Sequence, residues 1–308
     1  MRGVLTGFVG IWTVALAGYL ISRYKVLGAE GTGVLARLVF FVATPALLFT
    51  TLARSSLADV FTPALAVFVL STAIVAAVYL VIARWAWRRP VGEATVGALS
   101  ASYVNAANLG VPVAAYVLGD VSFVAPVLLF QVLVAAPLGL AVLDASSSTD
   151  RRPSPRRLAL LPARNPIMLG CAAGLAVSVA GWRPPVEVMR PFELVGSAAV
   201  PLALLALGMS LPGSRALAAG PQARERYTAV VLKVVAQPAL AYAIGRFGLG
   251  LGGPALLAGV VTSALPTAQN VFVFATRYGR AESLARDAVV LSTVAGGVSL
   301  ALIAAWLG

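Results

Sequence analysis

Long stretches without any charged residue are the feature that most constrains what this chain can fold into. Residues 60–83 and 122–143 contain no Asp, Glu, Lys or Arg, and an apolar run of about 18 or more residues is typical of a helix that crosses a membrane. Only 11% of the 308 residues are charged, whereas an ordinary soluble domain has about 25%. The sequence therefore predicts an all-α polytopic membrane protein.

Breaks rich in charged residues, proline or glycine divide the apolar sequence into ten predicted transmembrane helices. They are predicted at residues 4–22, 33–52, 60–84, 93–119, 122–143, 166–182, 187–211, 226–247, 254–276 and 285–307. The longest polar break, residues 144–165, is rich in Ser, Pro and Arg and cannot form a packed core, so we expect a flexible cytoplasmic linker there. It separates two predicted five-helix units, residues 1–143 and 166–308.

Lysine and arginine are distributed unevenly between the two ends of the predicted helices. Of the 23 Lys and Arg residues, 18 fall in or beside loops that follow odd-numbered helices, and 5 fall in the other loops and the termini. Because cytoplasmic loops are enriched in Lys and Arg, we expect a multi-pass protein of the plasma or inner membrane with both termini outside the cytoplasm. The net charge of +12 follows from this bias, so the expected surroundings are a lipid bilayer and no nucleic-acid partner is expected.

Related motifs recur in the two five-helix units at a nearly constant spacing. Pro45 and Pro201 lie 156 positions apart, and Asn108 and Asn270 lie 162 positions apart. Because each unit has an odd number of helices, the second copy would cross the membrane in the opposite direction to the first. Inverted repeats with paired, interrupted helices are typical of secondary transporters.

The fourth and ninth predicted helices each contain a proline near the middle, Pro112 and Pro266. A proline in a helix interior costs about 3 kcal/mol or more. In a membrane, the backbone groups that it frees are tolerated only where protein or a water-filled cavity satisfies them. Polar residues lie around both breaks, and Gly110 lies beside the first. The predicted substrate-binding residues are Asn105, Asn108, Gly110, Pro112, Pro266, Thr267, Gln269 and Asn270.

These two broken helices allow a structural and a functional interpretation. In the structural interpretation, the amides join neighbouring helices and the prolines only bend them. In the functional interpretation, which the pairing of the breaks favours, the two helices cross at a substrate site. The N-termini of half-helices present unpaired N–H groups and partial positive charge. The expected substrate is therefore an anion, typically a carboxylate.

Residues that cation or metal chemistry would require are missing from the predicted spans. No Asp or Glu lies near a helix centre, the chain has no histidine, and Cys171 is its one cysteine. A proton relay, a carboxylate-ligated sodium site, a metal site and a cofactor are therefore not expected. Three further polar residues, Gln131, Lys233 and Gln237, are candidates for a cavity or vestibule, although Lys233 could instead extend to the cytoplasmic surface.

Several motifs resemble those of one family of membrane transporters. They occur in order as "ATPALLF" in helix 2, "NAANLGVPVAAYVLGD" in helix 4, "NPIMLGCAAGL" in helix 6, "AVPLALLALGMSL" in helix 7, "LKVVAQPALA" in helix 8, "LPTAQNVFVFATRYG" in helix 9 and "VVLSTVAGG" in helix 10. Together they are similar to the auxin efflux carrier family, which includes plant PIN proteins and bacterial carboxylate carriers. The resemblance covers nearly the whole chain.

The resemblance implies a specific architecture and mechanism. It implies a scaffold of helices 1, 2, 6 and 7, a mobile transport domain of helices 3–5 and 8–10, elevator-type alternating access, a homodimer and an organic anion as substrate. It also places Asn108, Pro112, Pro266 and Asn270 at the crossing of helices 4 and 9. Plant carriers have a charged support site near the third helix, whereas this sequence has no acidic residue within that helix, which argues against auxin itself.

The function predicted from the sequence is therefore secondary transport of a small organic anion, with no enzymatic activity. A sodium-coupled symporter of related fold is the nearest alternative, because amide, hydroxyl and backbone oxygens can hold sodium without a carboxylate. A non-transporting membrane sensor is a further alternative. An intramembrane enzyme is disfavoured, because neither a His-Glu metal motif nor a Gly-x-Gly-Asp motif lies in a span.

Overall fold

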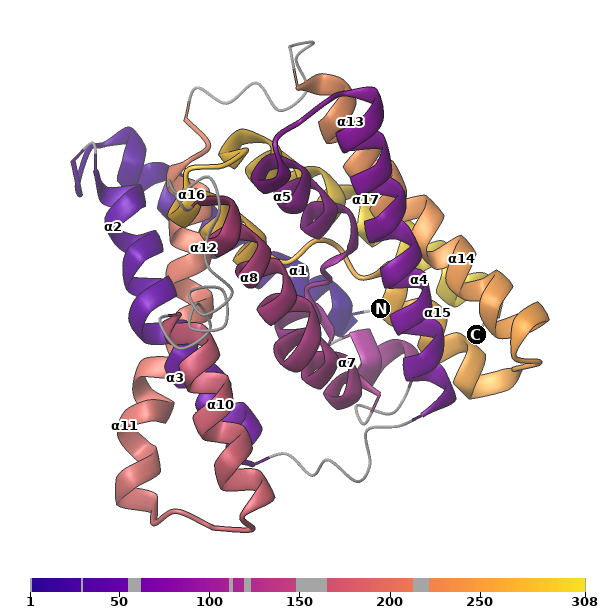
Figure 1. Ribbon diagram of the computed structural model, residues 1–308, viewed down its shortest axis with the longest axis horizontal. Helices are drawn as coiled ribbons and strands as arrows, with labels where there is room; N and C mark the ends of the chain where they lie inside the picture. The colour runs from indigo at the N-terminus through magenta and orange to yellow at the C-terminus, as the bar shows by residue number, and fades with distance from the viewer. Residues whose placement is uncertain are drawn as a thin grey trace.

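The computed structural model describes residues 2–28, 30–54, 62–110, 113–118, 123–147, 165–212 and 222–307. Within these residues the regular structure is helical (Figure 1), and no strand is present beyond one isolated antiparallel bridge between Val104 and Thr267. The all-helical class expected from the sequence is therefore confirmed.

Three of the described helical rods each contain two α-helices joined end to end by a single π-helical turn. In chain order the segments are α1 (Arg2–Arg23), α2 (Gly31–Leu38), η1 (Val39–Ala43), α3 (Thr44–Ala53), α4 (Pro63–Val81), η2 (Ile82–Ala86), α5 (Val91–Ser102), η3 (Ala106–Gly110), η4 (Ala114–Leu118), α7 (Val124–Phe130), η5 (Gln131–Ala135), α8 (Ala136–Ser147), α10 (Pro166–Val179), α11 (Val186–Ser197), α12 (Ala199–Met209), α13 (Ala223–Val231), η7 (Leu232–Ala236), α14 (Gln237–Ala243), η8 (Ile244–Gly248), α15 (Gly253–Ala264), α16 (Gln269–Tyr278) and α17 (Glu282–Leu307).

Several of these rods are long enough to cross a bilayer. Among the described residues, six helices meet this requirement by length and composition: Gly31–Ala53, Pro63–Ala86, Val124–Ser147, Val186–Met209, Ala223–Gly248 and Glu282–Leu307. Pro166–Val179 and Gly253–Ala264 are shorter apolar helices. The chain is thus a multi-pass helical membrane protein, whereas the inverted arrangement of ten helices and the orientation of the termini stay predictions.

The ends of the helices follow local sequence signals. Thr62 precedes α4, and its hydroxyl oxygen accepts a 3.1 Å hydrogen bond from the Leu65 N–H. Asn165 caps α10 in the same way, accepting a 3.1 Å bond from the Ile167 N–H. In both helices a proline follows the cap, where its missing N–H removes no helical bond. The rod Val124–Ser147 runs beyond the end expected at residue 143, and in its last turn the hydroxyls of Ser146 and Ser147 donate to the Leu143 carbonyl oxygen.

One set of helices, here called the first helix group, consists of α1, α2–α3, α10 and α11–α12, which pack against one another. Small residues allow this close packing. A Cβ atom added at Gly170 would lie 2.5 Å from the Pro45 carbonyl oxygen, and one at Gly174 would lie 2.6 Å from that of Phe49. The spacing of these glycines is typical of tight helix pairs in membranes, and α10 and α3 form such a pair.

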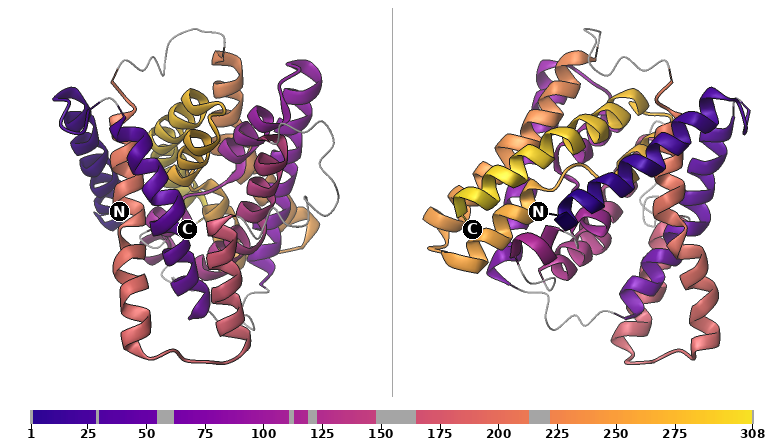
Figure 2. Two further views of the ribbon diagram at one scale, coloured as in Figure 1. Left: turned by 60° about the vertical axis from the view of Figure 1, so that its left-hand side comes forward. Right: turned by 180° about the vertical axis from the view of Figure 1, so that it is seen from behind.

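The remaining helices form a second helix group: α4, α5, α7–α8, α13–α14, α15, α16 and α17. In Figure 1, α2, α3, α10 and α11 lie to the left of α4, α14 and α15. The right-hand view of Figure 2 shows the same separation from behind. Contacts between the groups run mainly from α12 and α2 to α16. The broken segments between α5 and η3 and between α15 and α16 belong to the second group.

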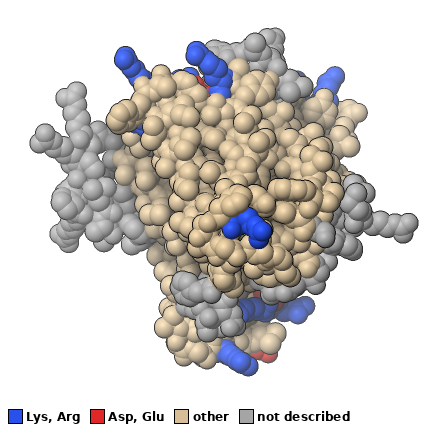
Figure 3. Space-filling view, turned by 90° about the vertical axis from the view of Figure 1, so that its right-hand side faces the viewer, with Lys and Arg blue, Asp and Glu red and all other residues tan. Residues whose placement is uncertain are grey.

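The outer surface is consistent with a lipid environment. Large apolar side chains such as Trp85, Phe247 and Trp306 are exposed. On the face shown in Figure 3, most of the surface is uncharged, and Lys and Arg gather toward its upper and lower margins apart from one basic group near the middle. An exposed apolar belt between charged margins is what a bilayer stabilises.

Candidate substrate site

Both helices that were expected to be interrupted are interrupted. Helix α5 ends at Ser102, and the chain is extended at Tyr103 before η3 begins at Ala106. Helix α15 ends at Ala264, and α16 begins at Gln269 after an extended segment that contains Pro266. In a continuous helix each carbonyl would accept a bond from the N–H four residues later, so each break frees several backbone groups.

The two extended segments pair with each other. The Asn105 N–H donates to the Pro266 carbonyl oxygen at 2.7 Å, and the Ala268 N–H donates to the Tyr103 carbonyl oxygen at 3.0 Å. These two bonds form the antiparallel bridge between Val104 and Thr267. Segments about 160 positions apart in the sequence thus cross at one point, and the crossing satisfies backbone groups that lipid could not.

Side chains from the neighbouring helices satisfy further freed groups at this crossing. The Gln131 amide donates a 2.8 Å hydrogen bond to the Val104 carbonyl oxygen. The Thr267 N–H donates to the Ser292 hydroxyl at 3.0 Å, and the Thr267 hydroxyl donates to the Ser100 carbonyl oxygen at 2.6 Å. The helix interruptions are therefore held in place by a set of buried polar contacts, which fix their geometry.

A small cavity of about 80 Å³ lies beside the crossing. Residues of α3 and α12 in the first helix group line one wall, and the crossing lines the other, so the cavity lies between the two helix groups. Its lining residues are Leu47, Leu48, Thr51, Tyr103, Val104, Asn105, Ala106, Leu128, Gln131, Val132, Val200, Ala268, Gln269 and Asn270.

The N-terminus of α16 supplies polar groups to this cavity. Gln269 and Asn270 are its first two residues, and the backbone N–H groups of a helix's first turn have no partner within the helix. The Gln269 side chain is 2% exposed, and within the described residues its Oε1 atom has no hydrogen-bond partner. A buried amide without a partner is rare in proteins. A half-turn of the amide would present its N–H₂ group to an anion instead.

Most of the residues predicted to bind substrate lie at this crossing. Asn105 is buried, Asn270 is half-buried, and both line the cavity. In the described part of the chain neither side chain makes a hydrogen bond. Thr267 is fully buried and has a structural role in the crossing rather than a position on the cavity wall.

The remaining predicted residues of the fourth helix are only partly described. Gly110 ends η3 and is packed tightly, since a Cβ atom there would lie 3.0 Å from the Val124 side chain. Asn108 lies within η3, its side chain lies outside the described structure, and Pro112 lies wholly outside the described residues. Their roles in substrate binding stay predictions.

The three polar residues suggested for a cavity or vestibule have different positions. Gln131 lines the cavity. Lys233 and Gln237 do not line it, and both are fully buried. The Lys233 ammonium donates to the Gln237 side-chain oxygen and, at 2.9 Å, to the Ser263 carbonyl oxygen, while the Gln237 amide donates to Thr72 at 2.9 Å. Lys233 therefore does not extend to the membrane surface.

Sequence reasoning missed two serines that hold the crossing, Ser100 and Ser292. Hydroxyl residues are common in membrane helices, so neither stands out alone. The repeat spacing offered a usable signal, because Gln131 and Ser292 lie 161 positions apart. Each bonds a freed backbone group of the break in its own half of the chain.

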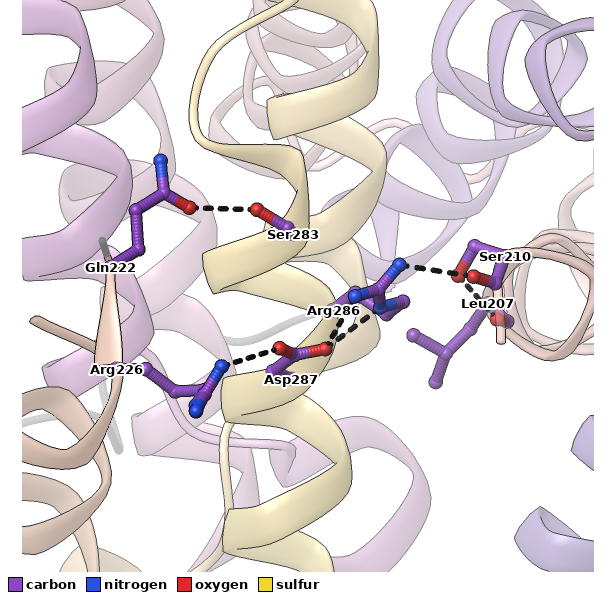
Figure 4. Close-up of polar contacts among 7 residues, drawn as sticks. All are labelled: Leu207, Ser210, Gln222, Arg226, Ser283, Arg286 and Asp287. Carbon is purple, nitrogen blue, oxygen red and sulfur yellow. Dashed lines mark hydrogen bonds and ion pairs between the residues drawn. The ribbon is translucent and has the colours of Figure 1, made fainter. Parts of the chain in front are cut away.

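A cluster of buried charges joins the two helix groups at the ends of α12, α13 and α17 (Figure 4). Arg226 of α13 donates to Asp287 of α17 at 3.1 Å. Arg286 contacts the other oxygen of the same carboxylate at 2.8 Å and also donates to the Ser210 carbonyl oxygen at 3.1 Å. Ser210 caps the end of α12 in the first helix group. The cluster is therefore a polar bridge between the groups.

A second polar bridge lies near the linker. Asn165, the residue that caps α10, donates to Asp144 of α8 at 3.2 Å. Tyr278 at the end of α16 donates to the other oxygen of Asp144 at 2.6 Å. Both bridges lie at helix ends that the distribution of Lys and Arg predicts to be cytoplasmic.

A pair of interrupted, crossing helices beside a polar cavity in a helical membrane protein is the arrangement of membrane transport proteins. The chain belongs to such a family: residues 4–143 and 142–304 match the family described as "Membrane transport protein". The resemblance to auxin efflux carriers expected from the sequence is thereby confirmed.

Individual relatives agree with this family assignment. The chain is 29% identical over 306 residues to "Putative malonate transporter" of Rhizobium meliloti (strain 1021), covering 96% of this chain and 92% of that protein. It is 25% identical over 291 residues to "Uncharacterized transporter YfdV" of Escherichia coli (strain K12), covering 89% and 90%. A shorter match, 41% identical over 66 residues, covers 21% of this chain and 18% of "Probable auxin efflux carrier component 5b" of Oryza sativa subsp. japonica.

Proposed function

We propose that this membrane transport protein is a secondary transporter that moves a small organic carboxylate, which binds at the crossing of the two broken helices. The observation that carries the proposal is the cavity beside the α16 N-terminus, where Asn105, Gln269 and Asn270 present amide groups without partners in the described structure. Backbone N–H groups at a helix N-terminus favour an anion, and amide N–H₂ groups add directional donors.

A short dicarboxylate is the substrate class that we would test first. One relative that covers most of this chain is named for malonate, and the cavity is small. Its apolar wall, which includes Leu47 and Val200, leaves little room for an aromatic ring. No buried acidic residue in the described lining opposes a second negative charge.

Elevator-type movement of the second helix group against the first is the mechanism that we propose. Two features support it: each group packs mainly within itself, and the cavity lies where the groups meet. In this scheme the first group, helices 1, 2, 6 and 7, is the fixed scaffold and forms the contact between two copies in a homodimer. The second group carries the substrate across a cell membrane in which both termini face outward.

Ligand binding to purified protein tests the site. Malonate, other mono- and dicarboxylates and indole acids are added in turn, and the melting temperature Tm is measured, because a ligand that binds the folded state raises Tm by mass action. We expect a carboxylate to raise Tm in the wild type, and Asn270→Ala and Asn108→Ala to reduce that increase while leaving the ligand-free Tm nearly unchanged. Unaltered binding in both variants would remove the crossing as the site.

Flux into proteoliposomes separates transport from sensing. Purified protein that binds a carboxylate and also accumulates it inside vesicles supports the transporter. Binding without flux, in vesicles that are shown to be sealed, would favour a membrane sensor instead.

A further inference from the structure

Lys233 is a buried cation that the proposed substrate site does not use. It lies in η7, in the middle of the rod Ala223–Gly248, and its side chain is 0% exposed. A charge in such a place is costly unless it is paired and hydrogen-bonded. No described Asp or Glu forms an ion pair with it, so neutral oxygens must hold the ammonium.

The oxygen that Lys233 contacts is one that the helix break sets free. In a continuous helix the Ser263 carbonyl would accept from the Thr267 N–H, four residues later. Because the chain breaks after Ala264, the Thr267 N–H turns to Ser292, and the Lys233 ammonium donates to the Ser263 carbonyl oxygen at 2.9 Å. The cation therefore lies at the C-terminal end of the half-helix α15, where the helix dipole is negative.

Among the described residues, no cation contacts the equivalent carbonyl of the other broken helix. There the freed Ser100 carbonyl accepts from the neutral Thr267 hydroxyl. The two breaks are alike in their backbone pairing but differ in this one respect. Two neutral oxygens accept from the Lys233 ammonium, the Gln237 side-chain oxygen and the Ser263 carbonyl, and the hydroxyls of Thr72 and Ser71 bond the Gln237 amide and the Ser263 hydroxyl behind them. Such a set is suited to a monovalent cation.

Sodium-coupled transporters with broken helices hold the coupling ion with this kind of oxygen, on freed carbonyls at half-helix C-terminal ends. We propose that the Lys233 ammonium is a built-in cation that occupies this position, so that the chain folds and binds its anionic substrate without sodium. Only the statement about substrate binding rests on the proposed carboxylate site. The statement about folding does not, because the Tm of the ligand-free protein reports directly on cation binding. If Lys233 occupies this position, the protein is a sodium-independent anion carrier rather than the sodium-coupled symporter that the sequence left as an alternative.

The test compares Tm of full-length protein in sodium chloride and in choline chloride at equal ionic strength. For the wild type we expect the same Tm in both salts. Lys233→Ala removes the ammonium and leaves a space lined by oxygens, so we expect a lower Tm in choline and an increase of about 2 to 4 °C on adding sodium or ammonium chloride. Lys233→Met fills that space without a charge, so it should respond to neither ion.

Arg246→Ala is the matched control, because Arg246 is an exposed basic residue near the end of the same rod. It should resemble the wild type in every salt. A wild-type Tm or carboxylate affinity that depends on sodium would overturn the proposal, as would a folded Lys233→Ala variant that gains nothing from sodium or ammonium.

If Lys233→Ala does not fold, the comparison of the wild type in sodium chloride and choline chloride still tests the proposal. Equal Tm and equal carboxylate affinity in sodium and choline then support the proposal, and a sodium requirement overturns it. If the wild type binds no carboxylate in any salt, the proposed function fails instead, and the cation response of the ligand-free protein still tests Lys233.

Discussion

The Gln131 side-chain amide donates a 2.8 Å hydrogen bond to the backbone carbonyl oxygen of Val104. Gln131 begins η5 and is 3% exposed, whereas Val104 lies in the extended break after α5. This contact supplies a donor that the interrupted helix itself lacks. Both residues line the cavity, so the bond joins a side chain of the cavity wall to the backbone of the helix break.

Replacing Gln131 by leucine should therefore destabilise the protein. The Val104 carbonyl would be left buried without its side-chain donor, which typically costs about 1–3 kcal/mol. Thermal unfolding of the purified variant measures this as a lower Tm. Val134→Ala, on the same rod but exposed, is the control and should change Tm little. A Gln131→Leu variant as stable as that control would show that the contact contributes nothing.

Gln269→Met should separate stability from binding. Its buried Oε1 atom has no partner in the described structure, and removing an unsatisfied buried group is neutral or stabilising. We expect an unchanged or higher Tm together with a loss of the Tm increase that a carboxylate produces. Retained carboxylate binding in this variant would exclude Gln269 from the site.

Asp287→Asn should be strongly destabilising, because Arg226 is 6% exposed and would lose its carboxylate partner. Breaking a buried ion pair from one side costs about 3–5 kcal/mol. The matched control is Glu193→Gln, which breaks the more exposed pair of Arg54 and Glu193. An exposed pair contributes about 0–1 kcal/mol. Equal Tm losses in the two variants would contradict this difference.

Glycines of α1 offer a test of helix packing within a single helix. A Cβ atom at Gly18 would collide with the Leu205 backbone of α12, whereas one at Gly10 would meet nothing within 4 Å. Gly18→Ala should therefore cost about 1–3 kcal/mol through overpacking. Gly10→Ala should be neutral or should stabilise the helix by up to about 1 kcal/mol. Thermal unfolding of both variants checks this, and equal Tm values would argue against the close contact of α1 and α12.

Features that depend on local sequence could be predicted well. Apolar runs and charged breaks gave the all-helical class and the places of the rods, and Pro266 marked the interruption of the ninth predicted helix. The break described in the fourth predicted helix begins at Tyr103, before Pro112, which lies outside the described residues. Gln269 and Asn270, the amides beside Pro266, line the cavity at the crossing, and their role in substrate binding stays a prediction. The inverted repeat and the direction of insertion stay predictions.

The crossing of the two broken helices was expected, but the side-chain contacts that hold it could not be predicted. Lys233 lies 30 positions from Ser263 and Thr267 lies 167 from Ser100, and no periodicity indicates that these pairs meet. From the sequence, Thr267 was predicted to bind substrate and Gln237 was a candidate for a cavity or vestibule. The structure instead uses Thr267 to hold the crossing and Gln237 to hold Lys233.

The crossing is joined by main-chain bonds between Asn105 and Pro266 and between Ala268 and Tyr103. Main-chain bonds of this kind do not require particular side chains, so substitutions on the cavity wall can accumulate without dismantling the crossing. Selectivity can therefore diverge while the backbone of the crossing, the proposed anion site, is inherited intact. In such a protein, the wall residues of α3 and α12, rather than the crossing itself, are the positions at which a new substrate range would evolve.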